Sequence, residues 1–114
     1  MIRYFDIELL PGAMGFLEKL EPKARDKILF NMAKARVQRD PVLLKKLDDN
    51  IWEFRTLYNG NAYRLFAFWN EPNRRTRLMI ATHGLHKKTQ KTPLKELQKA
   101  NEIRNQYFSQ HEKK

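Results

Sequence analysis

The sequence predicts an α+β fold: an N-terminal strand, a helical hairpin, a three-stranded antiparallel meander that joins the sheet, and a C-terminal helix. Three observations predict it. Stretches rich in β-branched and aromatic residues open the chain and recur in its second half, apolar residues at helical spacing follow both, and an Asn-Gly pair separates two strand-like stretches. With 114 residues, the chain has the usual size of one domain, and we expect a single domain over residues 1–114.

The first part of the chain predicts one strand and two helices. Residues 2–9 are rich in β-branched and aromatic side chains and end at a Pro-Gly pair, which indicates a strand and a turn. Apolar residues then recur at helical spacing in residues 13–20 and 24–39, with Pro22 between the two stretches. This pattern is typical of a helical hairpin. Asp40 and the proline after it end the hairpin, and the segment up to residue 50 is expected to be a polar connection.

The second part of the chain predicts three consecutive strands. Residues 51–58 and 61–69 alternate apolar and polar side chains on either side of Asn59-Gly60. This dipeptide suits a type I′ turn, because both central positions of that turn need a positive φ. Residues 76–83 predict the third strand of the meander.

A final amphipathic helix is predicted after the strands. Thr92 is a suitable N-cap and Pro93 a suitable first helical residue. Apolar residues then recur at helical spacing from Leu94 to Phe108, and Tyr107 belongs to this stripe.

Composition limits the partners and the compartment. Lys and Arg outnumber Asp and Glu by 23 to 13, and the net charge of +10 predicts an anionic partner, most simply a nucleic acid. An acidic protein, a membrane surface, or charge that serves solubility alone are the alternatives. The chain has no cysteine, no uninterrupted apolar segment near its start and no stretch long enough to span a membrane, so we expect a cytoplasmic protein.

Two arginines are predicted to face each other across the hairpin. If Asn59-Gly60 is the turn, Arg55 lies directly opposite Arg64 with both side chains on one face of the sheet. Like charges in this arrangement are destabilising, so an anion is expected to compensate them. Glu53 on the same face is an internal candidate, and the phosphate of a nucleic acid is an external one. Apolar neighbours on this face are expected to be Leu57, Phe66, Ile80 and Thr82's methyl group.

A basic run follows the third strand and extends the arginine pair. The stretch HGLHKKTQKTP is expected to leave the sheet as a loop close to the two arginines. Its lysines are candidates for successive phosphate contacts, its Thr and Gln for sugar or base contacts, and two hairpin tyrosines for base stacking. These candidate RNA-binding residues are Lys87, Lys88, Thr89, Gln90, Lys91, Tyr58 and Tyr63. A solvated surface loop is the alternative for each lysine taken singly.

Other chemistries have weaker support. His83 and His86 have a spacing seen in some metal sites, but no third ligand is indicated nearby and the neighbouring lysines would repel a cation. We therefore expect no metal. The four glycines do not have the spacing of a phosphate-binding loop.

The order of elements, the strand pair IWEFR and YRLFAF, and above all HGLHKKTQKTP followed by KELQKA resemble the HigB branch of the RelE/ParE superfamily of bacterial toxins. The resemblance covers nearly the whole chain. It implies the toxin component of a type II toxin-antitoxin system, an endoribonuclease that cleaves messenger RNA on the ribosome without metal or other cofactor. It also implies an antitoxin partner, in this branch usually a helix-turn-helix protein of the HigA kind.

The implied reaction is attack of an RNA 2′-hydroxyl on the adjacent phosphorus. It needs a group that takes the 2′ proton, cations for the developing negative charge and a donor for the leaving oxygen. Arg55, Arg64, Lys87 and Lys88 match basic positions of the family and are assigned the charge-stabilising role. His86 is the first candidate for proton transfer, since imidazole titrates near neutrality, and a lysine with a pKa lowered by its cationic neighbours is the second.

Two alternatives remain open at this point. ParE relatives in the same superfamily poison DNA gyrase and do not cut RNA. A non-catalytic basic module that binds nucleic acid is the other alternative, for which the net charge alone would suffice.

Overall fold

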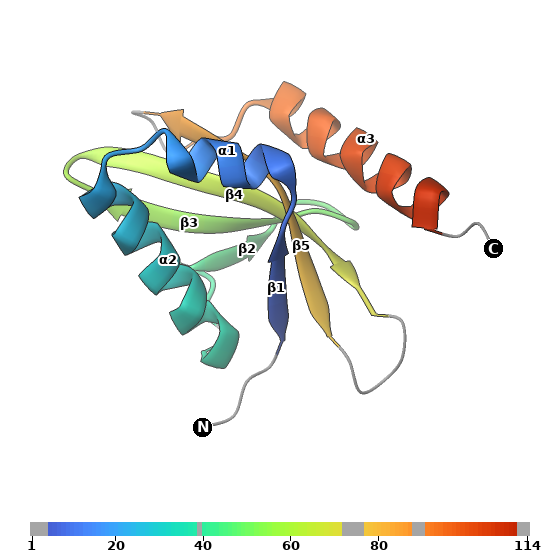
Figure 1. The fold of residues 1–114 in the computed structure, drawn as a ribbon, viewed down its shortest axis with the longest axis horizontal. Helices are drawn as coiled ribbons and strands as arrows, with labels where there is room; N and C mark the ends of the chain where they lie inside the picture. The colour runs from blue at the N-terminus through green and yellow to red at the C-terminus, as the bar shows by residue number, and fades with distance from the viewer. Residues whose placement is uncertain (1–4, 39, 72–76, 88–90, 112–114) are drawn as a thin grey trace.

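A computed structural model describes residues 5–38, 40–71, 77–87 and 91–111 of the chain. It has five strands and three helices, and the α+β prediction is confirmed (Figure 1). In chain order the elements are β1 (Asp6–Leu9), α1 (Pro11–Glu18), α2 (Pro22–Val37), β2 (Leu44–Lys46), β3 (Trp52–Tyr58), β4 (Asn61–Asn70), β5 (Leu78–Lys87) and α3 (Leu94–His111). Among these helices, none is both long and apolar enough to cross a membrane.

The five strands form one sheet in the order β1-β5-β4-β3-β2. The opening strand β1 lies parallel to β5, whereas β2, β3, β4 and β5 pair antiparallel in succession. β1 therefore forms one edge of the sheet. After α1 and α2, β2 forms the opposite edge, and β3, β4 and β5 follow in order back toward β1. This arrangement agrees with the predicted meander that joins the first strand.

Two boundaries differ from prediction. The expected polar connection contains β2, whose three residues pair with β3, and the prediction of a strandless segment was wrong. Three residues with two lysines are too short to show the period of two that identifies a strand. The last strand also continues through Lys87 rather than ending at His83, because β4 is ten residues long and offers backbone partners to the end.

The β3–β4 turn has the predicted conformation. Asn59 and Gly60 have φ values of 54° and 78°, so both central residues lie in the left-handed region that a type I′ turn requires. The resulting register places Arg55 opposite Arg64, as predicted.

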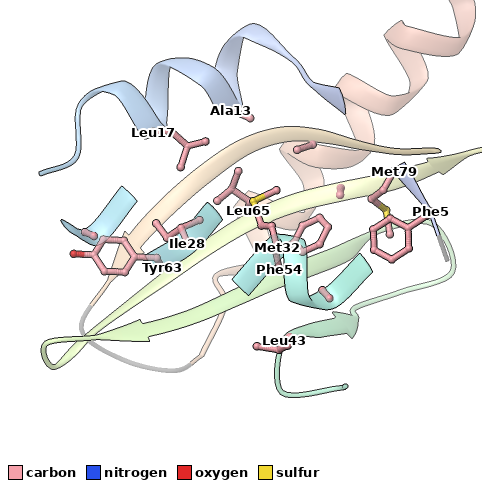
Figure 2. Close-up of a cluster of buried hydrophobic side chains, with 14 residues drawn as sticks. Phe5, Ala13, Leu17, Ile28, Met32, Leu43, Phe54, Tyr63, Leu65 and Met79 are labelled. Atoms are coloured by element: carbon pink, nitrogen blue, oxygen red, sulfur yellow. The ribbon is translucent and has the colours of Figure 1, made fainter. Parts of the chain in front are cut away.

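Helices cover both faces of the sheet. The face under α1 and α2, called here the hairpin face, holds a cluster of buried apolar side chains that includes Phe54, Leu65 and Met79 (Figure 2). The opposite face, called the α3 face, holds a smaller cluster around Phe66 and Phe68, against which Leu97, Tyr107 and Phe108 of α3 also pack. Each strand alternates its side chains between these two faces.

A β-bulge in β5 changes that alternation partway along the strand. Phe66 pairs with His83 and Ala67 with Ala81, so Thr82 is the extra residue. Before the bulge the odd-numbered residues of β5, such as Met79, point to the hairpin face, and after it the even-numbered residues do. The bulge therefore decides which residues of the basic run reach the α3 face.

Candidate functional site

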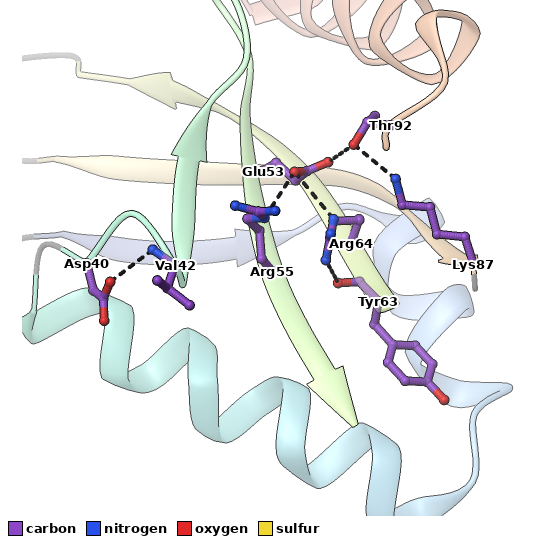
Figure 3. Close-up of polar contacts among 8 residues, drawn as sticks. All are labelled: Asp40, Val42, Glu53, Arg55, Tyr63, Arg64, Lys87 and Thr92. Atoms are coloured by element: carbon purple, nitrogen blue, oxygen red, sulfur yellow. Dashed lines mark hydrogen bonds and ion pairs between the residues drawn. The ribbon is translucent and has the colours of Figure 1, made fainter. Parts of the chain in front are cut away.

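A group of charged side chains lies on the α3 face near the turn end of the sheet. Glu53 and Arg55 come from β3, Arg64 from β4 and Lys87 from the end of β5, while Thr92 precedes α3 (Figure 3). These five residues are called the cationic cluster. Arg64 and Arg55 are direct cross-strand partners, and Lys87 lies diagonally from Arg64, because its own partner is Ala62.

Glu53 is the centre of the cluster. Its Oε1 atom lies 3.4 Å from Nε of Arg64 and 3.6 Å from Nε of Arg55. Its Oε2 atom accepts a hydrogen bond from the Thr92 hydroxyl, and Nζ of Lys87 donates to the Thr92 oxygen over 3.4 Å. One carboxylate is thus shared by two guanidinium groups and linked through a hydroxyl to an ammonium group.

The internal carboxylate compensates only part of the positive charge. Arg55, Arg64 and Lys87 carry three positive charges against the one negative charge of Glu53, which leaves an excess of two. Lys45 of β2 adds to this excess, since it pairs with Glu53 across the strands and its side chain is exposed. Sequence reasoning missed Lys45 because it missed the strand that places it.

The two arginines differ in exposure. The side chain of Arg64 is completely buried, whereas that of Arg55 is 25% exposed, and Glu53 between them is 2% exposed. The Arg64 guanidinium also donates through Nη1 to the backbone oxygen of Tyr63 at 3.3 Å. Of the two guanidinium groups, that of Arg55 is the one exposed enough to contact an anion from solvent.

Burial and like charge lower two pKa values in the cluster. The pKa of Lys87 is lowered first by burial and then by the positive charges of Arg64 and Arg55, while Glu53 opposes the change. Burial likewise lowers the pKa of Arg64, with a further lowering by Arg55 and an opposing effect of Glu53. An arginine stays protonated in any case, so Lys87 is the cluster cation whose proton is most easily lost.

Three predicted site residues lie on the other face of the sheet. His86 stacks on Tyr63 with the ring centres 4.6 Å apart, and its Nε2 atom lies 3.0 Å from Oδ1 of Asn61. Tyr63 is a member of the hairpin-face cluster, and Tyr58 packs against the same cluster. The structure does not bring His86, Tyr58 or Tyr63 together with the arginines. The reason is alternation: the tyrosines have the parity of the hairpin face, and the bulge gives His86 that parity too.

Lys91 is exposed, and the predictions for Lys88, Thr89 and Gln90 lie outside the described residues. Tyr107, predicted to belong to the apolar stripe of the last helix, accepts a hydrogen bond from Nδ2 of Asn70 and contacts Phe68. Asn70 is at the opposite end of β4 from the hairpin turn, roughly 20 Å along the strand from Arg64. Tyr107 therefore belongs to the packing of α3 and not to the cationic cluster.

His83 has a structural environment. Its ring stacks on Phe66 at 4.8 Å, its Nε2 atom lies 3.0 Å from Oε1 of Glu96, and its Nδ1 atom lies 2.8 Å from the Thr82 hydroxyl. These contacts attach the start of α3 to β5. No group of three or more potential metal ligands occurs within the part of the chain that the structure describes.

Comparison with known families gives one match. Residues 15–105 match the family model described as phage derived protein Gp49-like (DUF891), which spans most of the chain and includes every residue of the cationic cluster. A search of curated proteins found no matching protein.

Proposed function

The chain belongs to the phage-derived Gp49-like family, a toxin-like family of the RelE kind, and on that premise we propose that it is the toxin of a type II toxin-antitoxin system that cleaves messenger RNA on the ribosome. The observation that carries the proposal is the cationic cluster. It combines a partly exposed guanidinium, a buried guanidinium and a lysine of lowered pKa within one group of contacts. The HigB branch remains the branch that the sequence motifs favour.

The cluster has the charges that the RNA backbone needs. The exposed part of Arg55 offers a planar guanidinium to a phosphate, and Lys45 and Lys87 supply point charges on either side of Glu53. The cluster is positive overall and lies next to the apolar cluster that α3 covers. Water and salt ions therefore screen its attraction for a phosphate less than they would on an open surface.

The proposed reaction uses these side chains directly. The 2′-oxygen forms a bond to phosphorus while the bond from phosphorus to the 5′-oxygen breaks, which leaves a cyclic phosphate and a free 5′-hydroxyl. Lys87 in its neutral form takes the proton of the 2′-hydroxyl, and a proton from water or from protonated Lys87 neutralises the 5′-oxygen. Arg55 and Arg64 stabilise the negative charge that develops on the phosphoryl oxygens.

The test is translation of a defined message in a purified system, with the message ends mapped after incubation with the protein. We expect cleavage by the unaltered chain, a loss of roughly a hundredfold with Arg55→Ala, and a loss of at least that size with Lys87→Met. His86→Ala is the matched control, since this residue lies on the hairpin face, and it should retain cleavage. An intact message with the unaltered chain would reject the proposal.

The pH dependence separates Lys87 from a histidine as proton acceptor. A base must be deprotonated, so cleavage should increase with pH until the pH passes the pKa of Lys87, which burial and the two arginines lower. Lys87→Met should remove this increase. The same increase with pH in Lys87→Met as in the unaltered chain would contradict the assignment of Lys87.

A non-catalytic RNA-binding module is the second candidate, and the complete burial of Arg64 favours it, since a buried guanidinium can serve the fold alone. It predicts binding of RNA that weakens steeply with salt, without new message ends. A gyrase inhibitor of the ParE kind would act in a supercoiling assay while leaving the message intact.

A further inference from the structure

A hollow of about 260 Å³ lies on the hairpin face, where β3 begins and β4 ends. It is called here the aromatic hollow. Most of its wall is apolar, and its polar lining residues are Gln38, Asp40 and Arg77. The apolar lining residues are Phe5, Ala35, Pro41, Leu44, Trp52 and Trp69. The hollow is separate from the cationic cluster, because Trp52 and Leu44 have the hairpin-face parity and Glu53 and Arg55 have the other.

The walls of the hollow are fixed by contacts among themselves. Phe5 meets Trp69 at 5.2 Å with the rings at 89°, and Trp52 meets Trp69 at 6.1 Å and 75°. The Arg77 guanidinium lies 4.4 Å from the centre of the Trp69 ring, and its Nε atom donates to Glu71 over 2.6 Å. Both tryptophans nevertheless remain only partly buried. A rigid, preformed and partly exposed aromatic wall lowers the entropic cost of binding.

We propose that the aromatic hollow binds one large apolar side chain, such as phenylalanine, from an acidic segment of a partner protein. Its volume lies just below the range of pockets that hold a complete drug-sized ligand, so one side chain fits it better than a whole nucleotide. Aromatic side chains in a preformed pocket are typical anchors of protein interfaces. Val42, which is 69% exposed beside Pro41, extends the apolar surface beyond the hollow.

The charges around the hollow favour an acidic segment. Lys46 pairs with Trp52 across β2 and β3 and thus shares its face, and Lys34 lies one helical turn before Gln38, which lines the hollow. Both lysines are exposed, and no ion pair engages either of them among the described residues. Two acids lie nearby: Asp40, which lines the hollow and accepts the amide of Val42, and Glu71, which pairs with Arg77. The three positive charges of Lys34, Lys46 and Arg77 exceed these two negative charges, so the surroundings of the hollow stay positive.

The edge of the sheet favours an extended segment rather than a second copy of the chain. β2 is the edge strand of the described sheet, and the Leu44 amide on its outer side already donates to the backbone oxygen of Asp40. An added strand would therefore pair with the outer backbone groups of Lys46. Two copies meeting at this edge would bring Lys45 and Lys46 against the same lysines, and each copy carries a net charge of +10. An acidic partner has no such repulsion to overcome.

This inference rests on the proposed function in one respect, because the partner it fits is the antitoxin that a toxin-like family suggests. A segment anchored in the aromatic hollow lies on the face opposite Arg55 and leaves the cationic cluster uncovered. Inhibition would then come from the bulk of the antitoxin, which blocks entry into the ribosome, and not from competition with phosphate.

Tryptophan fluorescence tests the proposal directly, since both tryptophans of the chain line the hollow. The probes are four: the heptapeptides DETFTED, DETATED and KKTFTKK, and 5′-AMP. We expect DETFTED to change the emission saturably and to bind at least tenfold more tightly than either other peptide, because a buried phenylalanine ring and the acidic flanks both contribute. Lys46→Glu should weaken DETFTED at least threefold, whereas Lys23→Glu, at the other end of α2, should not.

Three results would overturn the proposal: no saturable change with millimolar DETFTED, equal binding of DETATED or KKTFTKK, or saturation by 5′-AMP alone. The last result would make the hollow a nucleobase site. The message-cleavage assay is run on the same preparations. Peptide binding without cleavage rejects the proposed function and keeps the docking site, and cleavage without peptide binding does the reverse.

Discussion

The two faces of the sheet are both covered by helices, but they bury different kinds of side chain. Under α1 and α2 the buried cluster is apolar, and the buried hydrogen bond beside it between Nδ2 of Asn31 and the Thr56 hydroxyl, at 3.1 Å, joins two neutral groups. Under α3 the apolar cluster is smaller and gives way, toward the hairpin turn, to the buried side chains of Glu53 and Arg64. One face of the sheet therefore buries apolar surface, and the other also holds buried charged side chains.

Buried charge costs stability unless it is paired and hydrogen-bonded, so a protein of this size can hold little of it. The hairpin face provides apolar burial that supports the strands from one side. This support lets β3 and β4 present Glu53, Arg55 and Arg64 on the other side at defined positions. The contrast predicts that substitutions on the two faces differ in both size and character.

The largest effect is expected from removing the shared carboxylate. Glu53→Ala leaves the buried Arg64 and the half-buried Arg55 facing each other without the anion between them, and should lower the free energy of unfolding by about 3–5 kcal/mol. Denaturant unfolding measures this loss. Glu71→Ala removes the carboxylate of an exposed pair with Arg77 and should cost about 0–1 kcal/mol.

A double substitution sharpens the same comparison. Glu53→Met with Arg64→Met replaces the buried ions by apolar side chains and should recover much of the loss, while it abolishes function. If Glu53→Ala lowered the free energy of unfolding no more than Glu71→Ala does, the charged groups of the cluster would be hydrated. The contrast between a charged buried face and an apolar one would then be wrong.

The hairpin face should respond to steric change instead of charge. A Cβ atom on Gly84 would lie 2.2 Å from a ring carbon of Phe16, so Gly84→Ala must displace α1 from β5 or turn the ring away. We expect a loss of about 2 kcal/mol, because Phe16 is only partly buried and has some room to move. Message cleavage should persist under conditions where the variant is folded.

Gly15 in α1 is the matched control for Gly84. Nothing lies within 4 Å of a Cβ atom built there, and alanine favours a helix more than glycine does, so Gly15→Ala should stabilise by about 0.5–1 kcal/mol. Equal effects at the two glycines would show that α1 does not approach β5 as closely as described.

The fold and the arginine pair could be predicted because they depend on local signals. The Asn-Gly turn fixes the register of its hairpin, and that register alone places Arg55 opposite Arg64. The helical stripes similarly identify α1, α2 and α3. Strand β2 gave no such signal, and Lys45 beside Glu53 was missed with it.

The β-bulge in β5 determines which residues of the basic run join the cationic cluster, and regular alternation along a strand does not predict it. If β5 kept a regular alternation from Ile80 with no bulge at Thr82, His86 would lie on the arginine face and Lys87 on the other. The bulge reverses these two positions. Lys87, a lysine of the kind predicted as the second candidate for proton transfer, therefore joins the arginines, and His86, the first candidate, stacks on Tyr63. Thr92 was predicted as a helix cap, but its hydroxyl bonds Glu53, a contact between distant segments that only the tertiary structure provides.

Two threonines compare a charged hydrogen bond with a neutral one. Thr92→Val removes the donor to Glu53, and we expect a loss of about 1.5 kcal/mol, near the lower limit for a bond to a charged group because both guanidinium groups remain. Thr56→Val removes the acceptor of Asn31 and should cost about 1 kcal/mol. The same unfolding measurement gives both values.

The two threonines should also differ in their effect on function. Thr92→Val frees the Lys87 ammonium from its hydroxyl contact and should change the pH at which cleavage rises, whereas Thr56→Val should leave that pH unchanged. A shift in both variants, or in neither, would remove Thr92 from the cluster.

The smallest effect is expected from pH acting on His83, which joins β5 to α3. Burial is the main cause that lowers the pKa of His83, and Lys99 adds to the lowering, while the Glu96 carboxylate at 3.0 Å opposes it. Below the unfolded pKa of about 6.5, the unfolded chain binds a proton that the folded chain does not. Stability should therefore be constant above this pH and fall as the pH decreases from there toward the folded pKa. His83→Gln can still donate to Glu96 but does not titrate, so its unfolding free energy should change less between pH 7.5 and 5.5. His86 and His111 are present in both proteins, and the difference between the two profiles isolates His83. Parallel profiles would mean that His83 binds its proton equally in both states, and the junction between β5 and α3 would then be insensitive to pH.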